Sequence, residues 1–523
     1  MTMKLLLVKP SLDTYPHKPI NLALLSAIAK RRGWETCLFD AGAADAGVMA
    51  DPPEQAGRRV PPNGKPGNRG ERLGSAVRAL LREFPPDLVA MTVISDNRFT
   101  AAAITGAIRD ADPTVPVLWG GVEPTISPER ALREYKADLV CRGEGLGAFD
   151  DVLQACQENR DFRSIPNIWS RGDGGIVKNP VRPLVRDLDS LPFLDLGIYP
   201  AFSRQGRTPG ENYRNADHMI TWGCPNSCSY CINDFYHALY GPGYFIRQYS
   251  VGRIIDELQW LKEQFGITYL NFHDEDFLLK SEEYLELLSL AYRKQVDIPF
   301  SIMASPGSAT ERKAGLLKKM HCSTVAFGIE TGDMAIRTGI LRRNDSREDI
   351  IRSVTLFSRT GIRTSSFNML ALPFYSREAY EKTIELNRTA GVFAPYAGFF
   401  YPYEGTIARK IATEEGFFDP ENPDTAVNSL ARPALHFPCL SREELVGMRE
   451  VFPLYCRLPE GFFRYIRRAE MPDRTGIRLR ELLHRIAAEG YPAGPGSRET
   501  RRDETIYRHQ LDAVQNEKNP ELY

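Results

Sequence analysis

The segment Cys224-Pro-Asn-Ser-Cys228-Ser-Tyr-Cys231 places three cysteines within eight residues, in the spacing CxxxCxxC. It follows a strand-like run at residues 218–221. Three thiolates on one loop can hold an iron–sulfur cluster, and on a four-iron cluster they leave one iron open to another ligand. Zinc is the alternative, but a closed zinc site takes four ligands, and no CxxC or HxxxH partner follows at a suitable spacing. The segment therefore predicts a cluster with an open iron.

Alternating strand and helix patterns continue after this loop. A helical pattern spans residues 251–264, and further strand candidates follow with helical patterns between them. These candidates are residues 268–272, 299–304, 324–329, 363–370 and 396–400. Six strand–helix repeats predict a partial (βα)6 TIM-like barrel at residues 216–410, with functional residues at the carboxyl ends of its strands.

The N-terminal part predicts a second α/β domain, at residues 1–165. Apolar runs predict five strands with helices between them. The runs are residues 5–8, 36–39, 88–94, 115–119 and 139–141. This alternation is typical of a doubly wound parallel sheet of the Rossmann or flavodoxin type, which binds ligands beyond the carboxyl ends of its strands.

Three other segments complete the predicted organisation. Residues 42–70 are crowded with Gly, Pro, Asn and Arg, lack a clear period and are too long for an ordinary loop, so we expect a mobile insertion. Residues 166–215 are expected to be a linker, and residues 411–523 a mainly helical region.

Composition excludes several classes of protein. The 523 residues include 66 Lys and Arg against 67 Asp and Glu, a net charge of −1, so nucleic acid is not an expected partner. No run approaches the roughly 18 apolar residues of a membrane span, and no secretory signal is evident. The nine cysteines are better interpreted as thiols or metal ligands than as a disulfide framework. We expect a cytoplasmic protein.

The cysteine loop resembles the CxxxCxΦC signature of radical S-adenosylmethionine (SAM) enzymes, with Tyr230 at the aromatic position. The resemblance implies that Cys224, Cys228 and Cys231 bind a 4Fe-4S cluster whose open iron chelates the amino and carboxylate groups of SAM. Tyr230 would lie near the adenine. An electron donor such as flavodoxin or ferredoxin would reduce the cluster, and a 5′-deoxyadenosyl radical released from SAM would take a hydrogen atom from a small-molecule substrate.

Charged residues at other strand ends extend the resemblance. Asp274 and Glu275 close the second barrel strand, where members of the superfamily place acids near the SAM ammonium group. Glu330 closes the fourth strand in the sequence GIETG, which resembles the superfamily's GIES-type motif, and the resemblance implies that Glu330 contacts the bound SAM. Arg342 or Arg343 would reach the SAM carboxylate. Any one of these acids alone could be a solvated strand end or a helix cap.

Two further segments resemble superfamily motifs in part. The segment after the fifth strand resembles GLPGET, but Ala371 and Phe374 stand in place of its glycines, so a close backbone approach is not predicted there. Residues 401–406 resemble PYPGT, with Glu404 in place of a proline. Aromatic residues near the sixth strand could line a pocket for a large apolar or planar molecule, and core packing explains them equally well. They are Tyr396, Phe399, Phe400 and Tyr401.

A doubly wound sheet ahead of such a barrel resembles the cobalamin-binding subgroup of the superfamily. Small and polar residues after four predicted strands would approach a corrin or its nucleotide tail, although each could instead form a tight strand-to-helix turn. These residues are Pro10 and Ser11, Thr92 and Ser95, Gly120, Gly121 and Glu123, and Gly143, Glu144 and Gly145. The DxHxxG motif of mutase-type domains is absent, so no histidine ligand below the cobalt is predicted.

The leading hypothesis is a cobalamin-dependent radical SAM enzyme that methylates an unactivated carbon, in which one SAM supplies the methyl group and a second supplies the radical. Ring formation, ring contraction and oxygen insertion are alternatives within the subgroup. A methylthiotransferase would need a second cluster, but Cys37, Cys141 and Cys156 lie in patterns that favour burial. A non-enzymatic iron–sulfur sensor, or a radical enzyme without cobalamin, would also carry the cysteine loop.

Overall fold

The computed structural model describes residues 2–11, 18–45, 69–172, 174–202, 214–241, 246–421 and 432–488, with short pieces at 507–508, 510–512 and 514–515. Most of the predicted insertion at residues 42–70 lies outside the described residues. The chain divides into two compact units. The first comprises Met1–Asn226 and Ile232–Phe300, and the second comprises Ser227–Cys231 and Ser301–Tyr523.

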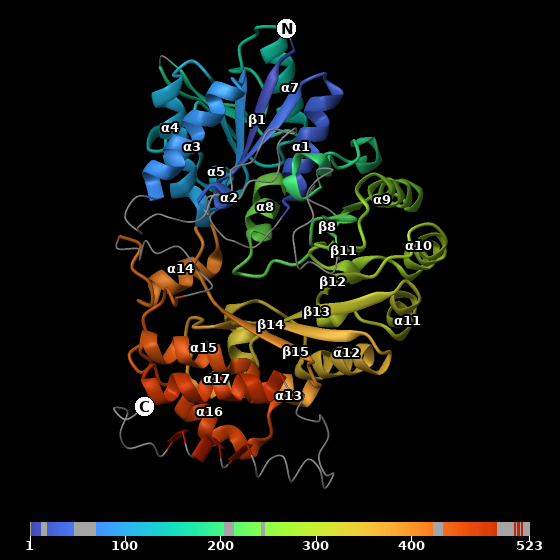
Figure 1. Cartoon of the computed structure of the whole chain (residues 1–523), viewed down its shortest axis with the longest axis vertical. Helices are drawn as coiled ribbons and strands as arrows, with labels where there is room; N and C mark the ends of the chain where they lie inside the picture. The colour runs from blue at the N-terminus through green and yellow to red at the C-terminus, as the bar shows by residue number, and fades with distance from the viewer. Residues whose placement is uncertain are drawn as a thin grey trace. The chain divides into compact units, whose positions relative to one another are not determined.

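A seven-stranded sheet in the order β2-β1-β3-β4-β5-β6-β7 forms the N-terminal part of the first unit (Figure 1). Its first five strands pair in parallel. They are β1 (Lys4–Lys9), β2 (Glu35–Asp40), β3 (Leu88–Thr92), β4 (Val117–Gly120) and β5 (Leu139–Cys141). The order 2-1-3-4-5 is that of flavodoxin, whose ligand crevice opens where the strand order reverses, here between β1 and β3. The predicted doubly wound fold is confirmed.

Helices cover both faces of this sheet because its parallel strands are apolar on both sides. α1 lies beside α7, and α3 lies beside α4 (Figure 1). The helices are α1 (Ile20–Arg31), α2 (Ala41–Asp45), α3 (Arg69–Glu83), α4 (Arg98–Ala111), α5 (Val122–Ile126), α6 (Pro128–Arg133) and α7 (Leu146–Gln157). The fully buried Trp119 of β4 stacks on Tyr135 and donates a hydrogen bond from Nε1 to Thr105 of α4 at 3.0 Å.

An antiparallel hairpin extends the sheet where the sequence predicted a linker. β6 (Ile168–Gly172) pairs antiparallel with β5, and β7 (Gly175–Lys178) pairs with β6. Ile168 and Ser170 are buried while Arg171 is exposed, which is the alternation of a half-buried strand. The sequence RGDGG between the two runs is a turn signal for such a hairpin.

The second sheet has six strands in the order β15-β14-β13-β12-β11-β8, and its β8–β11, β13–β14 and β14–β15 pairs are parallel. The strands are β8 (Asn215–His218), β11 (Tyr269–Phe272), β12 (Phe300–Ala304), β13 (Cys322–Glu330), β14 (Arg363–Leu370) and β15 (Ala394–Phe399). This order confirms the predicted partial TIM-like barrel. The strand predicted at residues 218–221 ends at His218, and a short strand β9 (Thr221–Trp222) pairs with β10 (Arg247–Gln248).

Helices follow the barrel strands as α8 (Ile232–Tyr240), α9 (Val251–Phe265), α10 (Glu282–Gln295), α11 (Glu311–Lys319), α12 (Arg347–Arg359) and α13 (Arg377–Ala390). From α9 onward, each begins after a Ser or Thr whose side-chain oxygen accepts a hydrogen bond from a backbone N–H of the first turn. These N-cap residues are Ser250, Ser281, Thr310, Ser346 and Ser376. Gly266 and Gly391 end α9 and α13 in the left-handed conformation that favours glycine.

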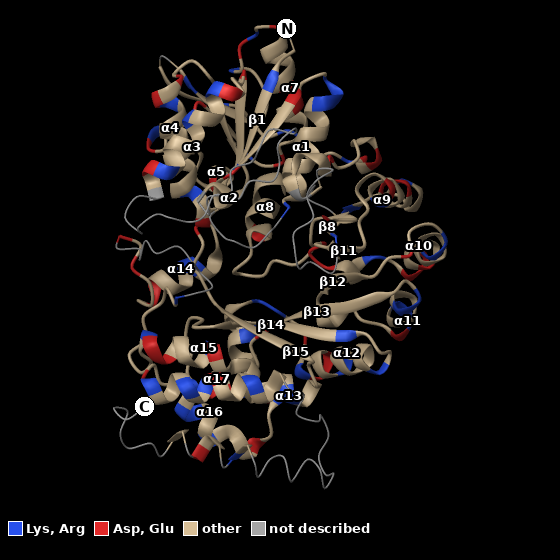
Figure 2. Cartoon of the chain, viewed as in Figure 1, with Lys and Arg blue, Asp and Glu red and all other residues tan. Residues whose placement is uncertain are grey.

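The C-terminal region of the second unit is helical, as expected. It comprises α14 (Ile407–Glu414), α15 (Arg442–Arg457), α16 (Phe463–Ala469) and α17 (Arg474–Ala488). A buried carboxylate ties it to α13, because Glu470 accepts two hydrogen bonds from Arg377, at 3.0 and 2.6 Å, and one from Tyr455 at 2.8 Å. Figure 2 shows many Lys and Arg along α16 and α17. Within the described residues, no helix is long and apolar enough to cross a membrane.

Candidate functional site

The cysteine loop is held in place by hydrogen bonds to its backbone. In the second unit, the Cys231 N–H donates to the Cys228 carbonyl at 3.0 Å, and the Ser229 N–H donates to the Leu341 carbonyl at 3.1 Å. In the first unit, Nε2 of His237 on α8 donates to the Cys224 carbonyl at 2.9 Å. His237 was not singled out from the sequence.

The donor set of this loop suits an iron–sulfur cluster. All three thiols are free of disulfides, and burial raises the pKa of Cys228 in the absence of a metal. Cys224 belongs to the first unit, whereas Cys228 and Cys231 belong to the second. Over the described residues, no three His, Cys, Asp or Glu side chains are close enough to hold a metal ion. The fit therefore rests on the number and spacing of the thiols and on their not being in disulfides.

Tyr230, Glu330 and Arg343 meet in the second unit. The Tyr230 hydroxyl donates to Glu330 Oε1 at 3.2 Å, and Arg343 Nη1 lies 3.2 Å from that hydroxyl and 3.7 Å from Glu330 Oε1. Burial raises the pKa of Glu330 and that of Tyr230. Although burial opposes it, the nearby Tyr230 and Glu330 raise the pKa of Arg343. The three side chains form a buried polar cluster at the end of β13.

The backbone at the end of β13 is built around the Glu330 side chain. Glu330 has a φ of +63°, which is rare for a residue other than glycine and is typical of functional sites. At Gly328, an added Cβ would lie 2.5 Å from Glu330 Oε1. A larger residue at position 328 would therefore displace the Glu330 carboxylate from this position.

Arg343, rather than Arg342, faces this cluster. Arg342 is exposed, whereas Arg343 is 9% exposed and its buried Nε has no hydrogen-bond acceptor among the described residues. A buried donor without an acceptor is costly, so the site suits an added anion such as a carboxylate. Sequence analysis missed Asp345, which lies 3.2 Å from Arg343, and the fully buried Arg337, which binds Asp345 at 2.9 Å.

Asp274 and Glu275 occupy different environments in the first unit. Asp274 is fully buried and accepts hydrogen bonds from the Ile220 and Thr221 N–H groups, at 3.1 and 2.7 Å, and from Lys280 Nζ at 2.5 Å. Its carboxylate therefore shapes the chain that leads into the cysteine loop. Glu275 is exposed and accepts one hydrogen bond, from the Gly223 N–H at 3.0 Å. Glu275 is the acid with an oxygen available for a ligand.

The segment after β14 has positive φ angles at two positions where the superfamily motif has glycine and this chain does not. Ala371 has a φ of +57° and Phe374 a φ of +64°, at the two positions where the GLPGET motif has glycine. This conformation costs an L-residue roughly 1–2 kcal/mol, which explains why glycine is favoured there. Phe374 packs edge-on against Phe417, with ring centroids 5.1 Å apart.

A cavity of about 230 Å³ opens beside this polar cluster in the second unit. Seven of its lining side chains are aromatic: Tyr230, Phe367, Tyr396, Phe399, Phe400, Tyr401 and Tyr403. The remaining lining residues are Glu330, Asn368, Met369 and Gly398. Phe399 and Phe400 are buried in the core, whereas Tyr396 is 47% exposed, so core packing explains the first two and not Tyr396.

Residues predicted to bind cobalamin lie around the crevice of the first sheet. The Ser95 hydroxyl donates to Glu123 at 2.9 Å, and Glu123 is 2% exposed and paired with Arg130 at 2.5 Å. Thr92 accepts a hydrogen bond from Asn21 of α1 at 2.8 Å. Pro10, Ser11 and Asn97 complete this edge, with the Asn97 amide donating to the Ser11 hydroxyl at 3.3 Å.

Two glycines allow close approach of chain segments at the same sheet edge. Gly121 has a φ of +106°, and an added Cβ would lie 2.7 Å from the Val93 carbonyl oxygen. Gly143 has a φ of +84°, and its added Cβ would lie 2.2 Å from the Tyr240 hydroxyl. The backbone conformation at both positions therefore requires glycine, whereas Gly120 and Gly145 keep negative φ and meet no atom closer than 3.3 Å.

Helix α8, which follows the cysteine loop, contacts the carboxyl-end edge of the first sheet. Tyr240 of α8 accepts a hydrogen bond from the Glu144 N–H at 2.5 Å, and its ring lies 6.4 Å from that of Tyr236. The Glu144 carboxylate is bound by Arg247 at 2.8 Å and by the Val185 N–H at 2.7 Å. Glu144 is therefore committed to the fold, and Tyr240 is a residue of this edge that sequence analysis missed.

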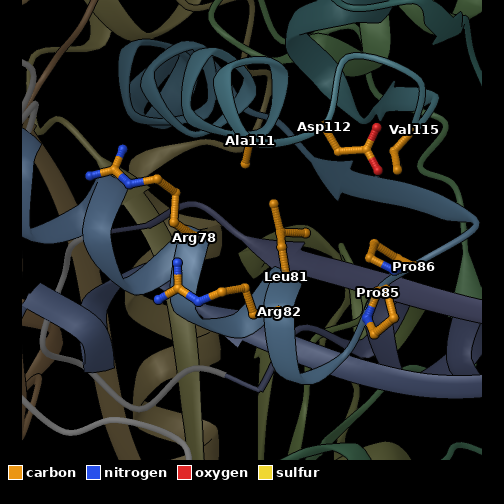
Figure 3. A pocket seen from close by; sticks show the side chains of 8 residues that line it. All are labelled: Arg78, Leu81, Arg82, Pro85, Pro86, Ala111, Asp112 and Val115. Atoms are coloured by element: carbon orange, nitrogen blue, oxygen red, sulfur yellow. The ribbon is translucent and has the colours of Figure 1, made fainter.

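A second cavity lies at the opposite edge of this sheet. It has a volume of about 330 Å³ and is lined by residues before β3 and β4, including Arg78, Arg82, Pro85 and Asp112 (Figure 3). Doubly wound sheets bind their ligands at the carboxyl ends of the strands. This cavity is at the amino ends, so we do not assign a cofactor to it.

Of the N-terminal cysteines, Cys141 is buried, and Cys37 and Cys156 are half-buried. Burial raises the pKa of Cys37, and it raises the pKa of Cys141 and of Cys156 to about 12. Cys37 lies in β2, Cys141 in β5 and Cys156 in α7, in the apolar patterns that favoured burial over a second cluster of the methylthiotransferase kind.

Comparison with known proteins identifies two domains. Residues 13–153 match the B12 binding domain, and residues 219–386 match the Radical SAM superfamily. The chain is 25% identical over 335 residues to an uncharacterized methyltransferase of Pyrococcus horikoshii, covering 64% of this chain and 70% of the relative. It is 22% identical over 471 residues to cytidylyl-2-hydroxyethylphosphonate methyltransferase of Streptomyces wedmorensis, covering 80% and 83%.

The fold is also found in a solved structure. The radical SAM methyltransferase TsrM of Kitasatospora setae, with cobalamin and a 4Fe-4S cluster bound, matches with a TM-score of 0.61 and 19% identity. The match covers 83% of this chain and 79% of that chain. At this level of identity the likeness shows a shared fold.

Proposed function

The chain belongs to the cobalamin-binding radical SAM enzymes, and on this basis we propose that it transfers a methyl group to a carbon atom of a small-molecule substrate. The observation that carries the proposal is the presence of a B12 binding domain and a radical SAM domain in one chain. Two relatives named as methyltransferases support the reaction type.

The cysteine loop has the residues to hold a 4Fe-4S cluster, and the polar residues at the end of β13 have the charges to bind SAM. Cys224, Cys228 and Cys231 would hold the 4Fe-4S cluster. Arg343 Nε would donate to the SAM carboxylate, and the exposed Glu275 would accept from the SAM ammonium group. When bound, the cofactors supply an electron, a 5′-deoxyadenosyl radical and a transferable methyl group.

The crevice between β1 and β3 suits cobalamin. Ser11, Thr92 and Ser95 lie beside this switch point, where doubly wound sheets bind ligands. Gly121 and Gly143 let neighbouring segments of the chain pack closely at these strand ends. An electron donor such as flavodoxin or ferredoxin would reduce the cluster.

Product analysis tests the reaction type. Anaerobic enzyme loaded with cluster and corrinoid is incubated with SAM, a reductant and an extract of small molecules, and nucleoside products are quantified. Methyl transfer by this scheme requires one S-adenosylhomocysteine and one 5′-deoxyadenosine for each methylated product. Formation of 5′-deoxyadenosine and a modified product without S-adenosylhomocysteine would indicate ring formation, ring contraction or oxygen insertion instead.

A further inference from the structure

The aromatic cavity of the second unit has a wall formed by two paired residues. Phe367 of β14 and Tyr396 of β15 stand directly opposite each other in the strand register. Their rings pack edge to face, with centroids 6.2 Å apart and an interplanar angle of 82°. Edge-to-face pairs leave part of each ring free for a further aromatic contact.

This wall faces away from the helices that cover the barrel. The neighbouring Ser366 and Asn368 bind Asn387 of α13, at 2.6 and 2.9 Å, so their side chains point to the helix layer. Successive side chains of a strand alternate between its faces, which places Phe367 on the opposite face, with Tyr396 beside it. Phe367 is 41% exposed and Tyr396 is 47% exposed, an unusual state for adjacent large aromatics in a sheet.

The polar groups of the cavity specify what kind of ligand it can take. None of the described residues that line it is a lysine, arginine or histidine. Its one carboxylate, Glu330, is held by Tyr230 and Arg343, and the Asn368 amide donates to Ser366 and to the Tyr396 carbonyl. The wall therefore offers ring faces and no cation, which disfavours a phosphate or carboxylate there.

We propose that the Phe367–Tyr396 wall binds an uncharged planar aromatic or heteroaromatic ring of the substrate. The inference rests on the proposed function, because it assigns the ring to the substrate of that reaction. Phe367 pairs with Gly328, and after a register shift Glu330 pairs with the next residue, Asn368, so the wall begins one residue before the expected SAM contact at Glu330. The substrate ring would thus lie deeper along the strands than the SAM carboxylate.

Equilibrium dialysis with a planar probe tests the proposal. Full-length, cluster-loaded protein is saturated with SAM and dialysed against 2-naphthol, or against decahydro-2-naphthol as its saturated counterpart. We expect 2-naphthol to bind and the saturated alcohol to bind several-fold more weakly, since stacking requires a planar ring.

Matched variants locate the binding site. Phe367→Leu and Tyr396→Leu keep apolar volume but remove a ring, and each should weaken 2-naphthol binding about three- to tenfold. Tyr396→Phe keeps the ring and should bind as wild type. Phe393→Leu removes a ring that is 60% exposed outside the cavity and should change nothing. All variants are compared at equal iron content and with matching circular dichroism.

The proposal would be overturned by no binding of 2-naphthol, by equal binding of the saturated alcohol, or by binding that the two Leu variants leave unchanged. Displacement of 2-naphthol by SAM would also overturn it, because the cavity would then belong to the SAM adenine. Dialysis requires neither corrinoid nor turnover. A protein that binds 2-naphthol but never carries corrinoid would therefore refute the proposed function rather than this binding site.

Discussion

Replacing Lys280 with methionine should loosen the chain that leads into the cysteine loop. Lys280 and Asp274 are both fully buried, and their atoms Nζ and Oδ1 lie 2.5 Å apart. Methionine fills the space of the lysine stem, and among the described residues it leaves the Asp274 carboxylate the Ile220 and Thr221 N–H groups as donors. Removing one partner of a buried ion pair costs about 3–5 kcal/mol, because the remaining charge stays buried without compensation.

Hydrogen exchange of the Ile220 and Thr221 amides measures this cost directly, since Asp274 is their acceptor. At 1.4 kcal/mol for each factor of ten, the Lys280→Met variant should exchange these amides about 100- to 4,000-fold faster. Lys318→Met removes an exposed lysine whose Nζ donates to the Gly361 carbonyl, and it serves as the control. Exchange in Lys280→Met within about threefold of wild type would refute the reasoning.

Three further predictions concern the cofactor sites. Arg343→Lys should weaken SAM binding at least about tenfold, because a buried charge-assisted hydrogen bond is lost, while Arg342→Lys should leave it unchanged; dialysis with labelled SAM measures both. Burial raises the Glu330 pKa, so this carboxylate protonates at a higher pH than an ordinary glutamate, and SAM affinity should fall as the pH is lowered from 7 toward 5. A Glu330→Gln variant should show a SAM affinity that does not change over this pH range. An equal fall in that variant would contradict the assignment of Glu330 as a SAM contact. Gly143→Ala should weaken hydroxocobalamin binding in absorbance titrations, because the added Cβ would lie 2.2 Å from the Tyr240 hydroxyl. Adding Tyr240→Phe should partly restore the binding, and wild-type affinity in Gly143→Ala would contradict the placement of cobalamin at this edge of the sheet.

The sequence predicted the sheet strands well because their patterns are local. Parallel strands buried on both faces are continuous apolar runs, and β5 and β14 begin and end at the predicted residues. The β6–β7 hairpin was missed because its half-buried strands are short and its turn signal lies in a stretch assigned to a linker. The end of β8 was misplaced by three residues, because Asp274, 53 residues after Thr221, withdraws the Ile220 and Thr221 amides from the sheet.

The sequence predicted which residue types the candidate site contains, but not which of these residues contact each other. Motif position singled out Glu330 and a pair of arginines, yet only the folded chain shows that Arg343 meets Tyr230, 113 residues away. The same holds for Tyr240, which reaches Glu144 across 96 residues. A pattern of neighbouring residues contains no information on such pairings. The positive φ of Ala371 explains the superfamily's glycine, although this chain lacks it.

The most direct test of the account is the corrinoid content per chain after anaerobic purification from cells supplied with cobalamin. Cyanide extraction and absorbance should give close to one corrinoid per chain, and a Cys224→Ala variant should keep the corrinoid while losing iron. Persistent absence of corrinoid from protein that carries its cluster and cleaves SAM would contradict the central claim, and would leave a radical enzyme whose first domain has another role.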